Sequence, residues 1–171
     1  MYSVDSQDRV IKLKDVPQAD VGAPQPLVLS DERTTLLAYS VQRKPHPFDD
    51  RVLTGADVKL FEDEAALVEF RSCQSFMFGA PNDEAFSGHP LADRGLSPYG
   101  AFEIENSSWI RQLEKMNSVH PEHQSGWLLT LKHFIFAFHD STFECVASGL
   151  SWSAHSGSPE SLFTEMRKRL Q

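Results

Sequence analysis

The chain has little cysteine and no long apolar run. Its two cysteines, Cys73 and Cys145, are too few for the disulfide framework that stabilises small secreted domains. No uninterrupted apolar stretch approaches the roughly 20 residues of a membrane span, and residues 1–15 lack the apolar core of a signal peptide. The sequence therefore predicts a cytoplasmic protein with reduced thiols and without a membrane partner.

Basic residues are outnumbered. The 16 Lys and Arg stand against 24 Asp and Glu, which gives a formal net charge of -8 at pH 7. Nucleic acids and anionic membranes both bind basic surfaces, so this balance argues against either as a general partner. A basic cluster at residues 167–169 lies at the end of a predicted helix, where cations offset the helix dipole.

Common catalytic signatures are missing too. The chain contains no G-x-S-x-G, no G-x-x-x-x-G-K-[ST] and no G-x-G-x-x-G, which removes the common hydrolase, P-loop and dinucleotide-binding signatures. Apolar residues, in contrast, are plentiful: they make up 40% of the chain, and phenylalanine occurs 12 times. This is enough for a single domain over residues 1–171 with its own core.

The first part of the chain predicts an arm followed by a hairpin. Residues 1–26 are polar and end in a stretch spaced by prolines, which predicts an extended N-terminal arm with at most one short strand, at 10–13. Period-two alternation on both sides of residues 30–33 then predicts a hairpin with a four-residue turn.

The next part predicts a loop and two more strands. Residues 44–50 are a predicted loop because their two prolines force extended backbone, and residues 57–62 a predicted strand. The first half of residues 63–79 is also compatible with a short helix. We favour one strand from about Leu67 to Phe78.

Two helices are predicted in the second half. Asn106 or Ser107 can cap a helix over residues 106–117. The sequence of residues 158–160 opens a C-terminal helix, with proline at its first position. The mid-chain helix carries an apolar stripe at helical spacing, formed by Trp109, Leu113 and Met116. With the strands, these helices predict an α+β fold: a mostly antiparallel, strongly curved sheet with a mid-chain helix and a C-terminal helix.

The last hairpin allows its side chains to be placed on two faces. A two-residue turn at 140–141 would put Phe138 opposite Phe143, and the even-numbered phenylalanines of the first strand would then share one core face with Cys145. The other face mixes polar and apolar residues, among them His139 and Glu144. The turn lacks glycine, so a three- or four-residue loop is an alternative, and a slip of one residue would exchange the faces.

A long irregular segment at residues 79–100 precedes the strand at 101–105. Compact domains seldom carry loops this long unless the loop is functional or disordered. One reading is an ordered loop held by ion pairs of Arg94, and the other is a ligand-contacting loop. If the polar face of the following strand coincides with the mixed face of the last hairpin, Glu103 and Glu105 would join the patch.

Candidate ligand-binding residues therefore come from the loop, the predicted helix and the last hairpin. They are Asn82, Asp83, Glu84, His89, Arg94, Asn106, Trp109, His120, His139 and Glu144.

The evidence for particular chemistry is weaker. Zinc sites need three or four converging ligands, and the weak metal candidates are His120, His123, His139 and Glu144. Cys145 is expected to be inert in an aromatic core, whereas Cys73 could be accessible. The sequence leaves the cofactor open.

Several segments between residues 76 and 147 resemble a family of small uncharacterised bacterial proteins. They are FGAPNDE, GHPL, NSSWI, MNSVHP and FHDSTFECVA. The resemblance implies a bacterial cytoplasmic protein, and it carries no known activity and no catalytic residue.

Three functions remain open from the sequence. The first is a non-catalytic module that binds a small molecule or a protein, with a pocket between the 79–100 loop, the start of the mid-chain helix and the mixed face of the hairpin. The second is a metal-assisted, hydrolase-type enzyme using His120, His139 and Glu144. The third is a purely structural protein-interaction module, with a homodimer through exposed sheet edges as one form.

Overall fold

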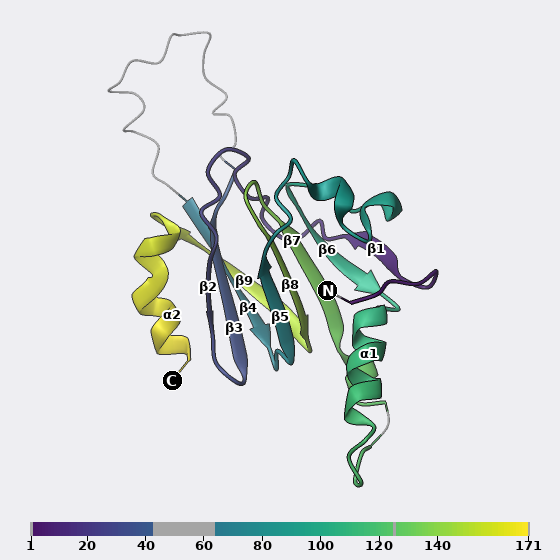
Figure 1. Ribbon diagram of the computed structural model, residues 1–171. Coiled ribbons are helices and arrows are strands. Elements are labelled where there is room, and N and C mark those ends of the chain that lie inside the picture. The colour runs from purple at the N-terminus through teal and green to yellow at the C-terminus, as the bar shows by residue number, and fades with distance from the viewer. Residues whose placement is uncertain (1, 43–63, 125, 171) are drawn as a thin grey trace, which may run out of the picture.

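The computed structural model describes residues 2–42, 64–124 and 126–170 (Figure 1). Within these residues the chain forms two antiparallel sheets. The first contains, in spatial order, β1 (Arg9–Lys12), β6 (Gly100–Glu105), β7 (Lys132–Ala137), β8 (Thr142–Ala147) and β5 (Ser75–Gly79). The second contains β2 (Leu27–Ser30), β3 (Thr34–Ser40), β4 (Glu64–Arg71) and β9 (Gly149–Ser156). The α+β class is confirmed, but two stacked sheets replace the single strongly curved sheet.

The two sheets pack face to face through aromatic side chains. Phe70 on β4 lies 5.2 Å from Phe143 on β8 and 5.6 Å from Phe136 on β7, between ring centroids. Tyr39 on β3 lies 5.4 Å from Phe138. Rings at these separations are in the range of favourable aromatic pairs, so phenylalanine and tyrosine rings form the contact between the two sheets.

The chain changes sheets where one long strand was predicted. β4 ends at Arg71, Ser72 takes a left-handed conformation with φ 50°, and β5 begins at Ser75 in the other sheet. The predicted strand over 67–78 is therefore wrong in its continuity, and the helical alternative for its first half is wrong as well. Period-two alternation continues through the turn, so the pattern did not reveal the break.

Helices cover the outer faces of both sheets. α2 (Phe163–Arg169) continues a 3₁₀ turn at Pro159–Leu162 and packs Leu162 and Met166 on the second sheet. α1 (Ser108–Asn117) lies against the first sheet, and Figure 1 shows it on the opposite side of the molecule from α2. β8 lies inside the first sheet between β7 and β5, with the second sheet against its inner face and Tyr2 and His89 against its outer face, so every residue of β8 is buried.

Local signals place α1 correctly. Ser107 caps the helix, because its Oγ atom accepts a hydrogen bond from the Ile110 amide at 3.3 Å. Trp109 is buried and Leu113 is partly buried, as the apolar stripe predicts. Met116 is 62% exposed, because the helix extends beyond the sheet that its first turn covers.

The last hairpin has a four-residue connection. Phe136, not Phe138, lies opposite Phe143, and the Phe138 amide bonds the Ser141 carbonyl at 2.8 Å. The pairing is therefore shifted by two residues from the two-residue-turn prediction. A shift of two preserves the side-chain alternation, so the predicted core face is confirmed.

The N-terminal segment runs extended along the first sheet and then crosses to the second. It forms β1 beside β6, and Ala19 makes an isolated bridge to Val41. Tyr2 is buried. The loop predicted at 44–50 and the strand predicted at 57–62 lie outside the described residues. No helix in the described part of the chain is long and apolar enough to cross a bilayer.

Candidate functional site

A buried polar network lies on the outer face of the first sheet. Glu144 on β8 is 3% exposed and accepts hydrogen bonds on both carboxylate oxygens. Its Oε1 lies 3.0 Å from Nε2 of His89, and its Oε2 lies 3.1 Å from Nε2 of His133. The Tyr2 hydroxyl donates to the same Oε2 at 2.9 Å. The carboxylate is therefore surrounded by three donors.

The surrounding contacts fix the protonation of the network. The Nδ1 atom of His89 accepts a hydrogen bond from the Leu91 amide at 3.1 Å, so the ring proton lies on Nε2 and is donated to Glu144. Nε2 of His133 faces the Glu144 carboxylate, which only accepts hydrogen bonds, so this nitrogen carries the proton. Burial lowers the pKa of His133 and favours the neutral imidazole, so its Nδ1 atom accepts from the Ser107 hydroxyl at 2.9 Å. His133 then also donates from Nε2, and both imidazoles are neutral.

The pKa values agree with an ionised carboxylate among neutral donors. Burial raises the pKa of Glu144, but hydrogen bonds from His133 and His89 outweigh it and lower that pKa to about 2. Burial lowers the pKa of His133 and, together with the charge of Glu144, raises the pKa of Tyr2. One buried negative charge is thus stabilised by hydrogen bonds from neutral groups.

This network connects three segments rather than opening a site. Tyr2 belongs to the N-terminal segment, His89 to the 79–100 loop, and Ser107 to the cap of α1. The loop fills the space above the sheet where a pocket was predicted. Its buried apolar residues Phe86, Leu91 and Leu96 pack against Phe102, Ile135 and Ala137. The loop, the helix start and the mixed face do meet, but side chains fill the space between them.

β6, the strand before α1, does not add its glutamates to the face of the sheet that carries Glu144. Phe102, not Glu103, lies opposite Ile135 on the face that carries Glu144. Glu103 lies opposite Phe134 on the inner face, and its partly exposed side chain pairs with Lys132 at 3.0 Å. Glu105 pairs with Arg9 at 3.5 Å. The expected glutamate patch is therefore wrong, because the apolar face of this strand meets the mixed face of the hairpin.

A second polar cluster holds the ends of the loop. Asp83 Oδ2 accepts a hydrogen bond from the Tyr99 hydroxyl and lies 2.9 Å from Nδ1 of His139. Hydrogen bonds from Tyr99 and His139 lower the pKa of Asp83, and its hydrogen bond to His139 raises the pKa of the imidazole. The sequence indicated Asp83 and His139 but missed Tyr99, whose contact depends on a left-handed backbone with φ 57°.

The remaining loop candidates make local or bracing contacts. Asn82 Oδ1 accepts from the Ala85 amide at 3.1 Å, and Glu84 is exposed. Arg94 bonds the backbone carbonyls of Asp5 and Asp8. These bonds attach the loop to the N-terminal segment. The Arg94 guanidinium also lies 3.9 Å from the Asp93 carboxylate, so one of the expected ion pairs of Arg94 is present.

Of the candidate residues on or near α1, only Trp109 contacts a residue of the buried network. Asn106 is exposed, in a left-handed conformation before the helix. Trp109 stacks on Tyr2 with ring centroids 5.2 Å apart. His120 is exposed and accepts from the Glu122 amide, and His123 lies 2.9 Å from Glu114.

The weak metal candidates do not come together. His123 pairs with Glu114, His139 with Asp83, and Glu144 with two other histidines. In residues 2–42, 64–124 and 126–170, no group of three or more His, Cys, Asp or Glu is arranged to hold a metal ion.

The two thiols lie in the core between the sheets. Cys145 is fully buried, and burial raises its pKa. Cys73 is 8% exposed, so its thiol is only slightly accessible, though less completely covered than Cys145. A hydrogen bond with Cys145 lowers the pKa of Cys73 to about 7, against the opposing effect of burial.

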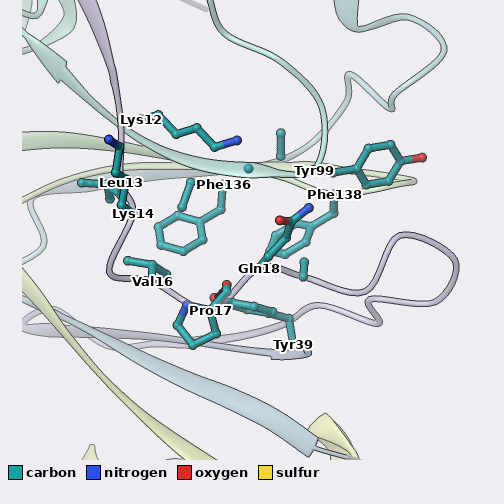
Figure 2. Close-up of a pocket in the computed structure, with 14 residues that line it drawn as sticks. Lys12, Leu13, Lys14, Val16, Pro17, Gln18, Tyr39, Tyr99, Phe136 and Phe138 are labelled. Carbon is teal, nitrogen blue, oxygen red and sulfur yellow. Dashed lines mark hydrogen bonds between the residues drawn. The ribbon is translucent and has the colours of Figure 1, made fainter. Parts of the chain in front are cut away.

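A cavity of about 320 Å³ lies between the sheets, at the side where the N-terminal segment crosses (Figure 2). Figure 2 shows Phe136 and Phe138 between Lys12 on one side and Pro17 and Tyr39 on the other. The Tyr39 hydroxyl donates to the Pro17 carbonyl at 2.7 Å, which fixes this wall. Other lining residues are Leu13, Lys14, Val16, Gln18, Ala19, Tyr99, Gly100, Ala101 and Ala137.

A wider hollow of about 600 Å³ adjoins this cavity. The two share Leu13, Lys14 and Val16, so the N-terminal segment runs between them. Arg71 and Lys132 add positive charge, and Lys132 is paired with Glu103. The sequence did not predict either space. Each space forms where residues 12–18 pass beside strands of the two sheets, and those strands lie far from residues 12–18 along the chain.

No protein-family profile, curated protein or solved structure matches this chain.

Proposed function

We propose that the chain is a non-catalytic, cytoplasmic binding module whose small-molecule ligand occupies the inter-sheet cavity. The observation that carries this proposal is an aromatic space of about 320 Å³ with Lys12 and Lys14 among its lining residues. Ligand sites are typically concave and mostly apolar, with a few polar groups that fix orientation. Membership of the bacterial family that the sequence resembles is part of the proposal.

The lining indicates the chemical class of the ligand. Phe136, Phe138 and Tyr39 present rings to an apolar body, while the exposed Lys12 and Lys14 attract a negative group. On a chain of net charge -8, such a local excess of lysine favours an anionic ligand at this place. A small organic acid with an aromatic or aliphatic body fits both features.

The buried Glu144 network supports the scaffold in this proposal. Its donors and acceptors are all used within the protein, and none of Glu144, His89 and His133 lines either cavity. A general acid or base needs access to a substrate, which these groups lack. Their role is to hold the sheet, loop and helix in place.

The test is an equilibrium titration with 1-anilinonaphthalene-8-sulfonate, which combines an apolar body with a sulfonate. We expect one fluorescent site per chain. Ala101→Leu fills the cavity and should weaken binding at least tenfold, and Lys14→Met should weaken it several-fold. Lys115→Met, an exposed lysine on α1, is the matched control and should bind like the wild type.

Thermal unfolding of each variant verifies that the fold is retained. If Ala101→Leu folds normally and binds the probe as well as the wild type, the cavity is not the site and the proposal fails.

A further inference from the structure

The outer edge of β5 lacks the protection that edge strands normally carry. β5 is the last strand of the first sheet, and no strand within the described residues pairs with its outer side. Between Arg71 and Asp83 the chain carries no charged side chain. The opposite edge strand of the same sheet, β1, carries Arg9 and Lys12. Charged side chains are a common device against edge-to-edge pairing, and of the two edges of the first sheet, β5 lacks them.

Apolar surface lies on both faces of this edge. On the inner face, Phe76 is 42% and Phe78 is 44% exposed. On the outer face, a hollow of about 220 Å³ is lined by Met77 and by Trp109 and Met116 of α1. A strand added beside β5 would bury apolar atoms on both faces and satisfy the free backbone groups of the edge.

We propose that β5 pairs with β5 of a second copy of this chain, in antiparallel fashion about a two-fold axis at Met77. The strand is symmetric in sequence about that residue, with phenylalanine on each side. A two-fold contact must be self-complementary. Pairing centred on Met77 places Phe76 opposite the partner copy's Phe78, and the reverse, on one face, with the two methionines on the other.

The second copy is favoured over an unrelated peptide by this symmetry. Cross-strand aromatic pairs form twice in the symmetric register, and no charged side chain of β5 enters the contact. The two five-stranded sheets would join into one sheet of ten strands (5 + 5). Because a five-residue edge is a small interface, we expect a concentration-dependent monomer–dimer equilibrium.

Sedimentation velocity over a hundredfold range of protein concentration tests the proposal. The wild type should shift from monomer to dimer, and Phe78→Lys should remain monomeric. Phe163→Lys is the matched control, because Phe163 is also 44% exposed but lies on α2, and it should dimerise like the wild type. Thermal unfolding reports whether each variant is folded.

A pair of double variants tests the register. Phe76→Lys with Phe78→Glu places an ammonium opposite the partner copy's carboxylate on both sides of the axis, so dimerisation should be retained. Phe76→Glu with Phe78→Glu places like charges opposite each other and should abolish it. Both variants carry two charges at the same positions, so their effects on the monomer fold are comparable.

Three results would overturn the proposal. They are a wild type that stays monomeric over the whole range, a dimer that survives Phe78→Lys, and double variants that associate equally.

Discussion

The Nε2 atom of His89 lies 3.0 Å from the Oε1 atom of Glu144, although 55 positions separate the two residues in the chain. This contact holds the 79–100 loop against the first sheet. His89 is 3% exposed, and its other ring nitrogen, Nδ1, accepts a hydrogen bond from the Leu91 amide. The loop is therefore an ordered cover of the first sheet, built around a histidine and three buried apolar residues.

Removing that imidazole should loosen the loop before the rest of the fold. For His89→Ala we expect faster amide hydrogen exchange over residues 80–99, with β7 and β8 still protected, because their ladder does not depend on His89. The matched control is His120→Ala, which removes an exposed histidine. Equal exchange in the wild type and His89→Ala would contradict this bracing role.

Glu144 should make a large contribution to stability. Glu144→Met keeps the side-chain length but leaves three buried donors without an acceptor, each at a cost of about 1–3 kcal/mol. We expect a loss of at least about 3 kcal/mol, which is a fall of roughly 10 °C in Tm for a chain of this size. Circular dichroism melting measures it.

Glu103→Met is the control for that substitution. Its ion pair with Lys132 is partly exposed to solvent, and its loss should change stability by less than about 1 kcal/mol. Similar falls in Tm for the two variants would contradict the prediction that the buried Glu144 network stabilises the fold more than the Glu103–Lys132 ion pair does.

Acid should destabilise the protein through this network. The folded-state pKa of Glu144, about 2, is below its ordinary value of 4.5, so its contribution is present above pH 4.5 and is lost as pH falls toward 2. His133 has a pKa below 6.5 in the folded state, so protons bind the unfolded chain preferentially below pH 6.5. Both groups therefore lower the stability of the folded protein as the pH falls.

Urea unfolding between pH 7 and pH 3 measures this dependence. Stability should fall steadily with pH in the wild type and less steeply in Glu144→Met, whose carboxylate is absent. Parallel pH profiles would contradict the assignment.

His139 should show the opposite pH dependence. The pKa of its imidazole is raised by Asp83, so its contribution is complete below pH 6.5 and is lost as pH rises through the higher folded-state value. The stability difference between the wild type and His139→Asn should therefore shrink from pH 6 to pH 9. NMR titration of the imidazole gives the pKa directly, and a value at or below 6.5 would be contrary to expectation.

The two thiols should react in a fixed order. Cys73 is 8% exposed with a pKa of about 7, whereas Cys145 is fully buried with a raised pKa, so a maleimide should label Cys73 first and Cys145 only on unfolding. Peptide mass spectrometry after timed labelling resolves the two sites. Simultaneous labelling in native buffer would show that the core opens as a unit.

The sequence by itself determined the local features of this protein. Period-two alternation assigned Phe134, Phe136 and Cys145 to one face of the last hairpin, and that assignment survived a wrong turn length because the error was an even number of residues. The cap at Ser107 and the opening of the C-terminal helix at Pro159 were also local, since capping depends on residues within one turn.

Only the tertiary structure decided what each face meets. The mixed face of the hairpin carries Glu144 with the predicted turn and with the observed one. The burial of Glu144, however, depends on a loop that begins 65 residues earlier (144 − 79) and on Tyr2 from the N-terminal segment. The cavity beside Lys14 likewise requires that segment to cross two sheets. Such contacts join residues that are far apart in the chain. Side-chain periodicity assigns residues to the faces of a strand or helix, but it carries no information about which faces pack against each other.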